Sequence, residues 1–170
     1  MLDQHTGIEL RNRAEAFARQ RGFQLDRMLG FGNDGVVWET TRGSALKIEE
    51  RRSGYERELA AYQRLGERGL AEIAGFAVPQ LVAYDDQLLA IEMTIVFPPS
   101  VLDFAKAYLD RPPDFSAEVL ADWETQTEDL FGERWPAVRH VLAKLRTHGI
   151  IYFDARPGNI RFADADHERT

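Results

Sequence analysis

Short apolar segments separated by polar turns occupy two parts of the chain. The first part runs from residue 23 to 50, where glycines and the turn Thr40–Gly43 divide three segments. In the second part, the turn Asp85–Gln87 divides two more, and Pro98 and Pro99 end the last because proline cannot continue a ladder. Such segments are typical of antiparallel strands. They predict strands at 25–29, 36–38, 45–48, 81–84 and 88–96.

Helical spacing of apolar residues marks the remaining segments. Thr6 and Glu9 resemble a capping box at the start of a leading helix that ends near Gly22. Ser100 and Asp103 give the same signal before Phe104, Tyr108 and Leu109, which predicts another helix ended by Pro112 and Pro113. Three further helices are predicted at 55–65, 116–131 and 135–148, the last stopped by Gly149.

The composition limits the possible functions. The chain has 170 residues, of which 44% are hydrophobic, enough for a real core. Its net charge of -7 and the lack of a basic block argue against nucleic acid as a partner. It has no cysteine, which excludes disulfides and thiolate catalysis, and no apolar run long enough to cross a membrane. We therefore expect a soluble cytoplasmic protein.

The composition changes from strand-rich to helix-rich at the two prolines. The sequence therefore predicts a boundary near residue 97, between a small lobe at 1–96, which includes the leading helix, and a helical lobe at 97–170.

A glycine-rich sequence follows the first predicted strand. Residues 30–37 read Gly-Phe-Gly-Asn-Asp-Gly-Val-Val, which fits the pattern G-x-G-x-x-G-x-V, and Lys47 ends a later apolar strand. This combination is typical of a hairpin that grips phosphates. Taken alone, the glycines are more often ordinary turn residues, and Lys47 would be a solvated lysine at the end of a strand.

A second polar sequence follows the last predicted helix. Residues 148–160 read HGIIYFDARPGNI, so that Asp154 and Asn159 lie on one loop with Arg156 and Pro157 between them. In isolation, the aspartate and the asparagine could simply cap and turn this loop. His148 is placed favourably by the dipole at a helix C-terminus, and we assign it no chemical role.

This second sequence resembles the catalytic loop of protein kinases and of related small-molecule kinases, whose pattern runs H-G-I, H-x-D and then K/R-P-x-N. The glycine loop, the lysine strand and the following helix precede it in the kinase order. The resemblance covers residues 23–163. It implies a protein kinase-like, two-lobed α+β fold, with a five-stranded antiparallel sheet and one packed helix in the small lobe. The large lobe would be abbreviated, with three or four helices.

The resemblance also implies a site for ATP. The backbone amides of Gly30, Gly32 and Gly35 would approach the phosphates, because a β-carbon would hold the chain away. Lys47 would place its ammonium on the α and β phosphates. A glutamate of the following helix would pair with this lysine, and Glu58 is preferred over Glu56 because Tyr62 and Leu65 follow it at the family's apolar positions. The remaining nucleotide contacts would come from the hinge Glu92, Met93 and Thr94, whose backbone would pair with adenine, and from Ala45 and Val37 above and below the base.

Transfer of the γ-phosphate to a hydroxyl is the implied activity. Asp154 would accept the proton of the attacking hydroxyl, Arg156 would neutralise the transferred phosphoryl group, and Asn159 would hold Mg²⁺. The acceptor, a protein serine or threonine or a small molecule, is left open by the resemblance.

The chain also departs from the family. Tyr152 and Phe153 stand where protein kinases have histidine and arginine. The family's second metal-binding aspartate lies in D-F-G after the asparagine, but here Asp164, Asp166 and Glu168 follow Asn159 without phenylalanine or glycine. Asp164 is the candidate for this ligand. No activation segment is recognisable, so a protein acceptor would have little surface on which to bind.

Three hypotheses remain open on these observations. The chain is a minimal ATP-dependent phosphotransferase, a pseudokinase-type module that binds nucleotide or a partner without turnover, or a fragment of a longer kinase. In the last case, the exposed apolar underside of the helical lobe would make it aggregate or dimerise.

Overall fold

A computed structural model of the chain describes residues 4–32 and 34–163. Its helices are α1 (Gln4–Arg21), α2 (Arg52–Glu67), α3 (Ala117–Phe131), the short 3-10 helix η1 (Gly132–Arg134) and α4 (Trp135–Thr147). Its strands are β1 (Leu25–Phe31), β2 (Gly35–Thr40), β3 (Ser44–Glu49), β4 (Glu72–Ile73), β5 (Phe76–Ala77), β6 (Leu81–Asp85), β7 (Ala90–Thr94), β8 (Ser100–Val101), β9 (Ala107–Leu109), β10 (Ile150–Tyr152) and β11 (Ile160–Arg161).

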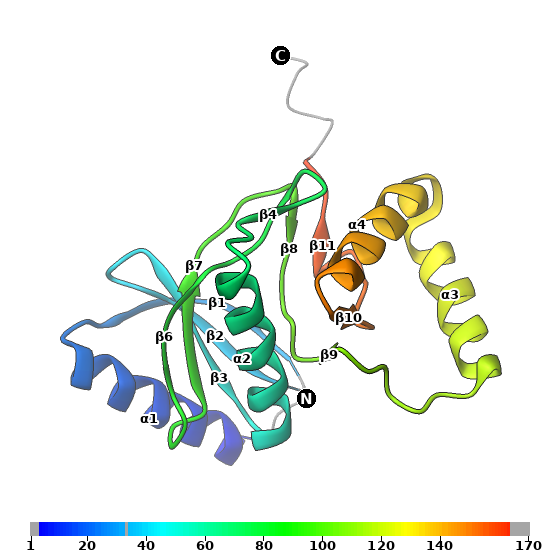
Figure 1. Ribbon diagram of the computed structural model, residues 1–170. Helices are drawn as coiled ribbons and strands as arrows, with labels where there is room; N and C mark the ends of the chain where they lie inside the picture. Colours follow the sequence, from blue (N-terminus) through cyan, green and yellow to red (C-terminus); the bar gives the residue numbers. More distant parts are fainter. Residues whose placement is uncertain (1–3, 33, 164–170) are drawn as a thin grey trace.

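The first part of the chain forms a five-stranded antiparallel sheet in the order β1-β2-β3-β7-β6 (Figure 1). This sheet and the packed helix α2 confirm the α+β architecture predicted from the sequence. Successive side chains of a strand point to opposite faces. On β3, Ala45 belongs to the core on the α2 side, whereas Leu46 and Ile48 belong to the core on the α1 side. The sheet is therefore covered by a helix on each face.

Helix α1 is the predicted leading helix. Leu10, Ala14, Phe17 and Ala18 share one stripe and are buried against the sheet. In the described residues the helix runs from Gln4, so Thr6 lies inside the helix and not before it. The apolar stripe fixes this helix to the sheet.

The prediction of a helix at 100–109 is wrong. Ser100 and Val101 form β8, which pairs with β11, and 107–109 form β9, which pairs with β10. Asp103 and Asp110 have φ of 57° and 61°, in the left-handed region where an α-helix cannot continue. The apolar spacing of this segment fits a helix, but pairing with the two later strands overrides it.

The two later helices agree with the sequence. Ser116 caps α3 by accepting a hydrogen bond from the amide of Val119, at 3.3 Å, and Gly149, with φ of 77°, follows the end of α4. Within the described residues, the second part of the chain has two α-helices joined by η1, and not three or four. The helix wrongly predicted at 100–109 accounts for the difference.

One core cluster spans the predicted lobe boundary. It contains Tyr62 of α2 and Ile91 of β7 from one side, and Phe104, Val141 of α4 and Ile160 of β11 from the other. Figure 1 shows β8 and β11 side by side between the sheet and α4. The division at residue 97 stays a prediction. No helix in the described part of the chain is long and apolar enough to cross a membrane.

Candidate active site

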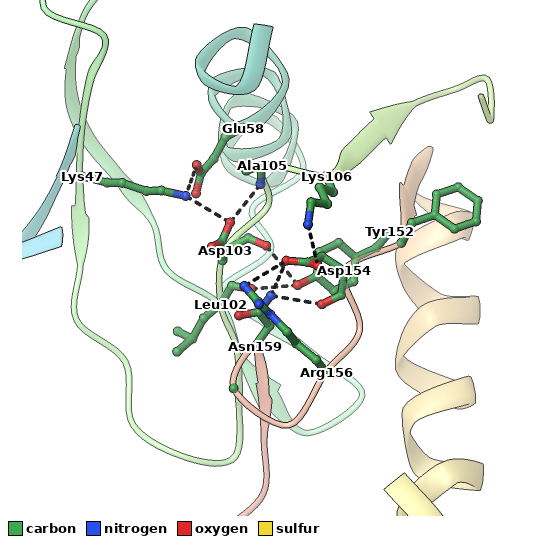
Figure 2. A network of polar contacts seen from close by, with 12 residues as sticks. Lys47, Glu58, Leu102, Asp103, Ala105, Lys106, Tyr152, Asp154, Arg156 and Asn159 are labelled. Atoms are coloured by element: carbon green, nitrogen blue, oxygen red, sulfur yellow. Dashed lines mark hydrogen bonds and ion pairs between the residues drawn. The ribbon is translucent and has the colours of Figure 1, made fainter. Parts of the chain in front are cut away.

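Lys47 lies in the interior, where β3 faces α2. Its side chain is 5% exposed, and its Nζ lies 2.6 Å from Glu58 Oε2, 2.8 Å from Glu49 Oε1 and 3.0 Å from Asp103 Oδ1. Figure 2 shows Glu58 and Asp103 approaching the ammonium from α2 and from the segment after β8. The ion pair expected between Lys47 and Glu58 is therefore present. Glu56 instead lies on the outer side of α2, with its side chain 62% exposed.

Three carboxylates around one ammonium set the charge of this cluster. Burial lowers the pKa of Lys47, but the attraction of Glu58, Asp103 and Glu49 outweighs it, so the pKa lies well above its usual value and the lysine stays charged. Burial raises the pKa of Glu58, and the neighbouring Asp103 and Glu49 carboxylates raise it further against the opposing effect of Lys47. A raised pKa favours the protonated, neutral form of Glu58.

A charge-reversal pair tests this arrangement. Glu58→Lys should destabilise the fold by several kcal/mol, because it places two ammonium groups side by side in a buried site. Glu56→Lys should change the free energy of unfolding by less than about 0.5 kcal/mol, as is usual for an exposed side chain. Urea unfolding of both variants measures the difference. Equal stabilities would contradict the burial of Glu58 against Lys47.

Asp154 follows β10 on a loop whose polar groups converge on it. The Asn159 amide nitrogen donates to Asp154 Oδ2 at 2.7 Å and to the Asp154 carbonyl at 3.0 Å. Lys106 Nζ lies 3.2 Å from Oδ1, and an Arg156 guanidinium nitrogen lies 3.3 Å from Oδ2. The Arg156 carbonyl accepts from the amides of Asn159 and Ile160, which closes the loop. The structure thus brings the predicted residues Asp154, Arg156 and Asn159 together.

Asp103 joins the lysine side of the site to the loop side. The hydroxyl of Tyr152 donates to the carbonyls of Leu102 and Asp103, at 3.0 and 2.9 Å, and the amide of Leu102 donates to the carbonyl of Asn159 at 2.7 Å. Figure 2 shows Asp103 between Lys47 and the group formed by Asp154, Arg156 and Asn159. The Lys47 and Asp154 sides therefore meet at one residue.

The phenylalanine after Asp103 fixes this junction to the core. The Phe104 ring is fully buried, 5.4 Å from the Tyr62 ring of α2 and 5.5 Å from the Tyr152 ring of β10, between ring centroids. Tyr62 lies one helical turn after Glu58. The positions of α2, Asp103 and the Asp154 loop are therefore coupled by packed aromatic rings.

The three glycines of the hairpin differ in what surrounds them. A Cβ on Gly35 would collide with the carbonyl oxygen of Ile48 on the neighbouring strand. A Cβ on Gly30 or Gly32 would meet nothing within 4 Å, and Phe31 between them is 72% exposed. Gly35 is therefore required by sheet packing, whereas Gly30 and Gly32 leave the surface of the hairpin open, as an approach to phosphates needs.

Alanine substitutions separate these two roles. Gly35→Ala should lower the free energy of unfolding by about 1–3 kcal/mol, because the new methyl group is forced into backbone of β3. Gly30→Ala should leave thermal stability nearly unchanged, because a Cβ there meets nothing within 4 Å. Differential scanning calorimetry checks the pair, and a stable Gly35→Ala variant would contradict the packing.

The predicted hinge needs a correction. Glu92, Met93 and Thr94 lie inside β7, which is paired with β3 on one side, while Glu92 and Met93 also pair with β6 on the other. The Glu92 carboxylate is buried and accepts from the hydroxyl of Ser44 at 2.6 Å. Backbone outside the ladder begins only at residue 95, so 95–97 replace 92–94 as the candidate segment for adenine. The side chains of Ala45, Val37 and Met93 lie in or against the core on the α2 side.

Sequence reasoning missed three charged residues of the site. Glu49 lies two residues after Lys47 on the same strand face, a spacing that could have identified it. No sequence pattern identified Lys106 as a residue of the site. Asp103-Phe104-Ala105 departs from D-F-G at one residue, but it precedes the Asp154 loop and was interpreted as a helix start. Asp164, the metal ligand predicted from the sequence, lies outside the described residues.

The conditions for a metal ion are only partly met by protein groups. Within 4–32 and 34–163, no group of three or more histidine, aspartate or glutamate side chains is arranged to hold a metal. A cation at the site would therefore need asparagine or phosphate oxygens in addition to carboxylates.

A cavity of about 510 Å³ lies elsewhere, and neither Lys47 nor Asp154 lines it. Its lining residues are Pro98, Leu130, Phe131, Arg134, Pro157, Ile160, Arg161 and Phe162.

Comparisons with known proteins give little beyond this geometry. No family model matches the chain, and no curated protein matches it. Among solved structures, the aminoglycoside phosphotransferase APH(2″)-IIa in a ternary complex with streptomycin and ATP is 16% identical, with a TM-score of 0.39, over 77% of this chain and 37% of that one. ADP-bound APH(2″)-Ib is 18% identical, with a TM-score of 0.41, over 71% and 39%. The chain thus spans about two fifths of either structure.

Proposed function

We propose that this chain binds ATP with Mg²⁺ and transfers the γ-phosphate to a hydroxyl. The observation that carries the proposal is the meeting of two sequence-distant groups at Asp103. Lys47 with Glu58 lies on one side of this residue, and Asp154 with Asn159 lies on the other. A buried ammonium facing a carboxylate and an amide is a set of groups suited to phosphoryl transfer.

Each group has a defined task in this reaction. Lys47 holds a fixed positive charge for the phosphates, because its three carboxylate neighbours keep it protonated in the interior. Asp154 accepts the proton of the attacking hydroxyl, and its side chain is 11% exposed, so solvent reaches it only in part. Arg156 is half-exposed beside it, and can turn toward the charge on the transferred group.

Asn159 has an oxygen that suits Mg²⁺ as the metal. The amide nitrogen of Asn159 is committed to Asp154, which leaves its oxygen, the atom type that Mg²⁺ prefers, for a cation. Magnesium, when bound, neutralises phosphate charge and orients the γ-phosphate. The protein residues supply the binding, the orientation and the proton acceptor.

A nucleotide-binding module without turnover is the second candidate. The specific observation in its favour is that both oxygens of Asp154 are already paired, one with Lys106 and the other with Arg156 and Asn159. In the enzyme, at least one of these pairs must open for Asp154 to meet a hydroxyl. In a module without turnover, all of these pairs can stay closed.

Thermal unfolding with and without ATP and Mg²⁺ tests the proposal. Ligand at about a hundred times its dissociation constant should add about 2.7 kcal/mol, which raises Tm by roughly 5–11 °C for a chain of this size. AMP is the control, because it lacks the β phosphate that Lys47 would contact and the γ phosphate that would be transferred. No shift with ATP would contradict both candidates. A shift without phosphate transfer to any hydroxyl or to water would favour the module.

A further inference from the structure

We propose that Asp103 is the carboxylate that completes the metal site, so that this ligand comes from before the Asp154 loop and not from the acidic sequence after it. The inference rests on the proposed function, since it concerns the metal that would accompany ATP. Asp103 comes before the Asp154 loop in the chain. It belongs to none of the kinase-like motifs in the sequence.

The partners of Lys47 are the first argument. Glu58 and Glu49 already lie 2.6 and 2.8 Å from the ammonium, so Lys47 has two buried carboxylate partners without Asp103. Asp103 adds a third carboxylate at the edge of the cluster, 3.0 Å from Nζ. An ionised carboxylate can bridge this ammonium and a second cation, because its two oxygens can take different partners.

The exposure of the three carboxylates is the second argument. The side chains of Glu49 and Glu58 are 1% and 0% exposed, whereas that of Asp103 is 26% exposed. Asp103 Oδ1 is held by Lys47 and by the amide of Ala105, at 3.0 and 3.1 Å. Within the described residues, Oδ2 has no hydrogen-bond partner. At its accessible side, the cluster therefore presents a carboxylate whose orientation is fixed.

The strand pairing supplies the third argument, because it places Leu102, the residue before Asp103, opposite Asn159. β8 and β11 pair through Val101 and Ile160, and the next hydrogen bond joins Leu102 to the carbonyl of Asn159 at 2.7 Å. The hydroxyl of Tyr152 holds the Asp103 carbonyl at 2.9 Å. The carboxylate of Asp103 and the amide of Asn159 thus stand on adjacent strand ends, on the side of Lys47 and Asp154 (Figure 2).

The two side chains also match in chemistry. Carboxylate and amide oxygens are hard donors, and Mg²⁺ is typically held by one or two carboxylates together with substrate phosphates and water. Asp103 and Asn159 would supply two ligands, and the nucleotide would supply others. This accounts for the lack of a self-sufficient cluster of metal ligands within residues 4–32 and 34–163.

Calorimetric titration of ADP, with and without Mg²⁺, tests the inference on the full chain. Wild-type protein should bind ADP more tightly with Mg²⁺. Asp103→Asn should lose at least tenfold of this metal-dependent gain and keep its metal-free affinity for ADP. The double variant Asp164→Asn, Asp166→Asn should keep the gain. Mn²⁺ in place of Mg²⁺ gives an independent readout, because its electron paramagnetic resonance signal reports bound metal directly.

Glu49→Gln is the matched control, because it also removes one carboxylate from Lys47 but on the buried side. It should keep the metal-dependent gain, whereas a merely structural role of Asp103 would make both variants behave alike. If Asp103→Asn does not fold by circular dichroism, Asp103→Glu replaces it, and a longer carboxylate should reduce the gain by misplacing its oxygens. Full metal dependence in a folded Asp103 variant, or its loss in the Asp164, Asp166 variant, would overturn the inference. Wild-type protein that binds no ADP would instead refute the proposed function.

Discussion

Asp154→Asn should lower the rate of phosphate transfer by about 10²–10⁴-fold, because it removes the group that accepts the hydroxyl proton. The substitution is nearly isosteric, and the new side chain still offers an oxygen to the Asn159 amide, which lies 2.7 Å from Asp154 Oδ2. The affinity for Mg·ADP should therefore change little. Release of ADP from ATP measures the rate, with candidate alcohols as acceptors and water as the acceptor in their absence.

Asp129→Asn is the control for this variant. Asp129 lies on the exposed surface of α3, so the same loss of one carboxylate there should leave the rate unchanged. An Asp154→Asn variant that transfers phosphate as fast as wild-type protein would contradict the assignment of Asp154 as proton acceptor. A rate loss accompanied by an equal loss of nucleotide affinity would show that Asp154 acts in binding.

Lys47→Met should be among the most destabilising single substitutions in the chain. It leaves Glu49, Glu58 and Asp103 without their shared ammonium in a site where two of the three are buried. Removing one partner of a buried ion pair typically costs about 3–5 kcal/mol, which corresponds to a fall in Tm of roughly 6–20 °C at this chain length. Thermal unfolding followed by circular dichroism measures the change.

A second substitution distinguishes lost charge from lost packing. Lys47→Met combined with Glu58→Gln should regain part of the stability, because the buried charge left over is smaller. Lys144→Met, on an exposed face of α4, should change stability by less than about 0.5 kcal/mol. A Lys47→Met variant as stable as wild-type protein would be inconsistent with the burial of the lysine among three carboxylates.

Elements with strong local signals could be predicted from the sequence. The five strands of the sheet and helices α1, α2, α3 and α4 were identified because turns, glycines and apolar periodicity act over a few residues. Glu58 was preferred over Glu56 because Tyr62 and Leu65 follow it at the apolar positions of the kinase family, and its contact with Lys47 follows from the face of α2 that it shares with Tyr62. Local patterns are sufficient where an element packs on a neighbour in the chain.

The segment 100–109 could not be predicted in this way. Its apolar spacing suits a helix, but β8 and β9 pair with β11 and β10, which come some 40 to 60 residues later in the chain. The sequence does not show this pairing, which is what places Asp103. Its contacts with Lys47 and with the loop of Asp154 therefore could not be predicted. The hinge was misplaced for a similar reason, because the end of β7 depends on which strands flank it.

A backbone amide NMR titration with Mg²⁺ and a non-hydrolysable ATP analogue tests most directly whether the hairpin and the Asp154 loop form one nucleotide site. The account predicts that resonances from both regions, including Gly32, Lys47, Asp103 and Asn159, shift together and saturate with a single dissociation constant. Shifts confined to one region, two unrelated dissociation constants, or no shifts at all would contradict it.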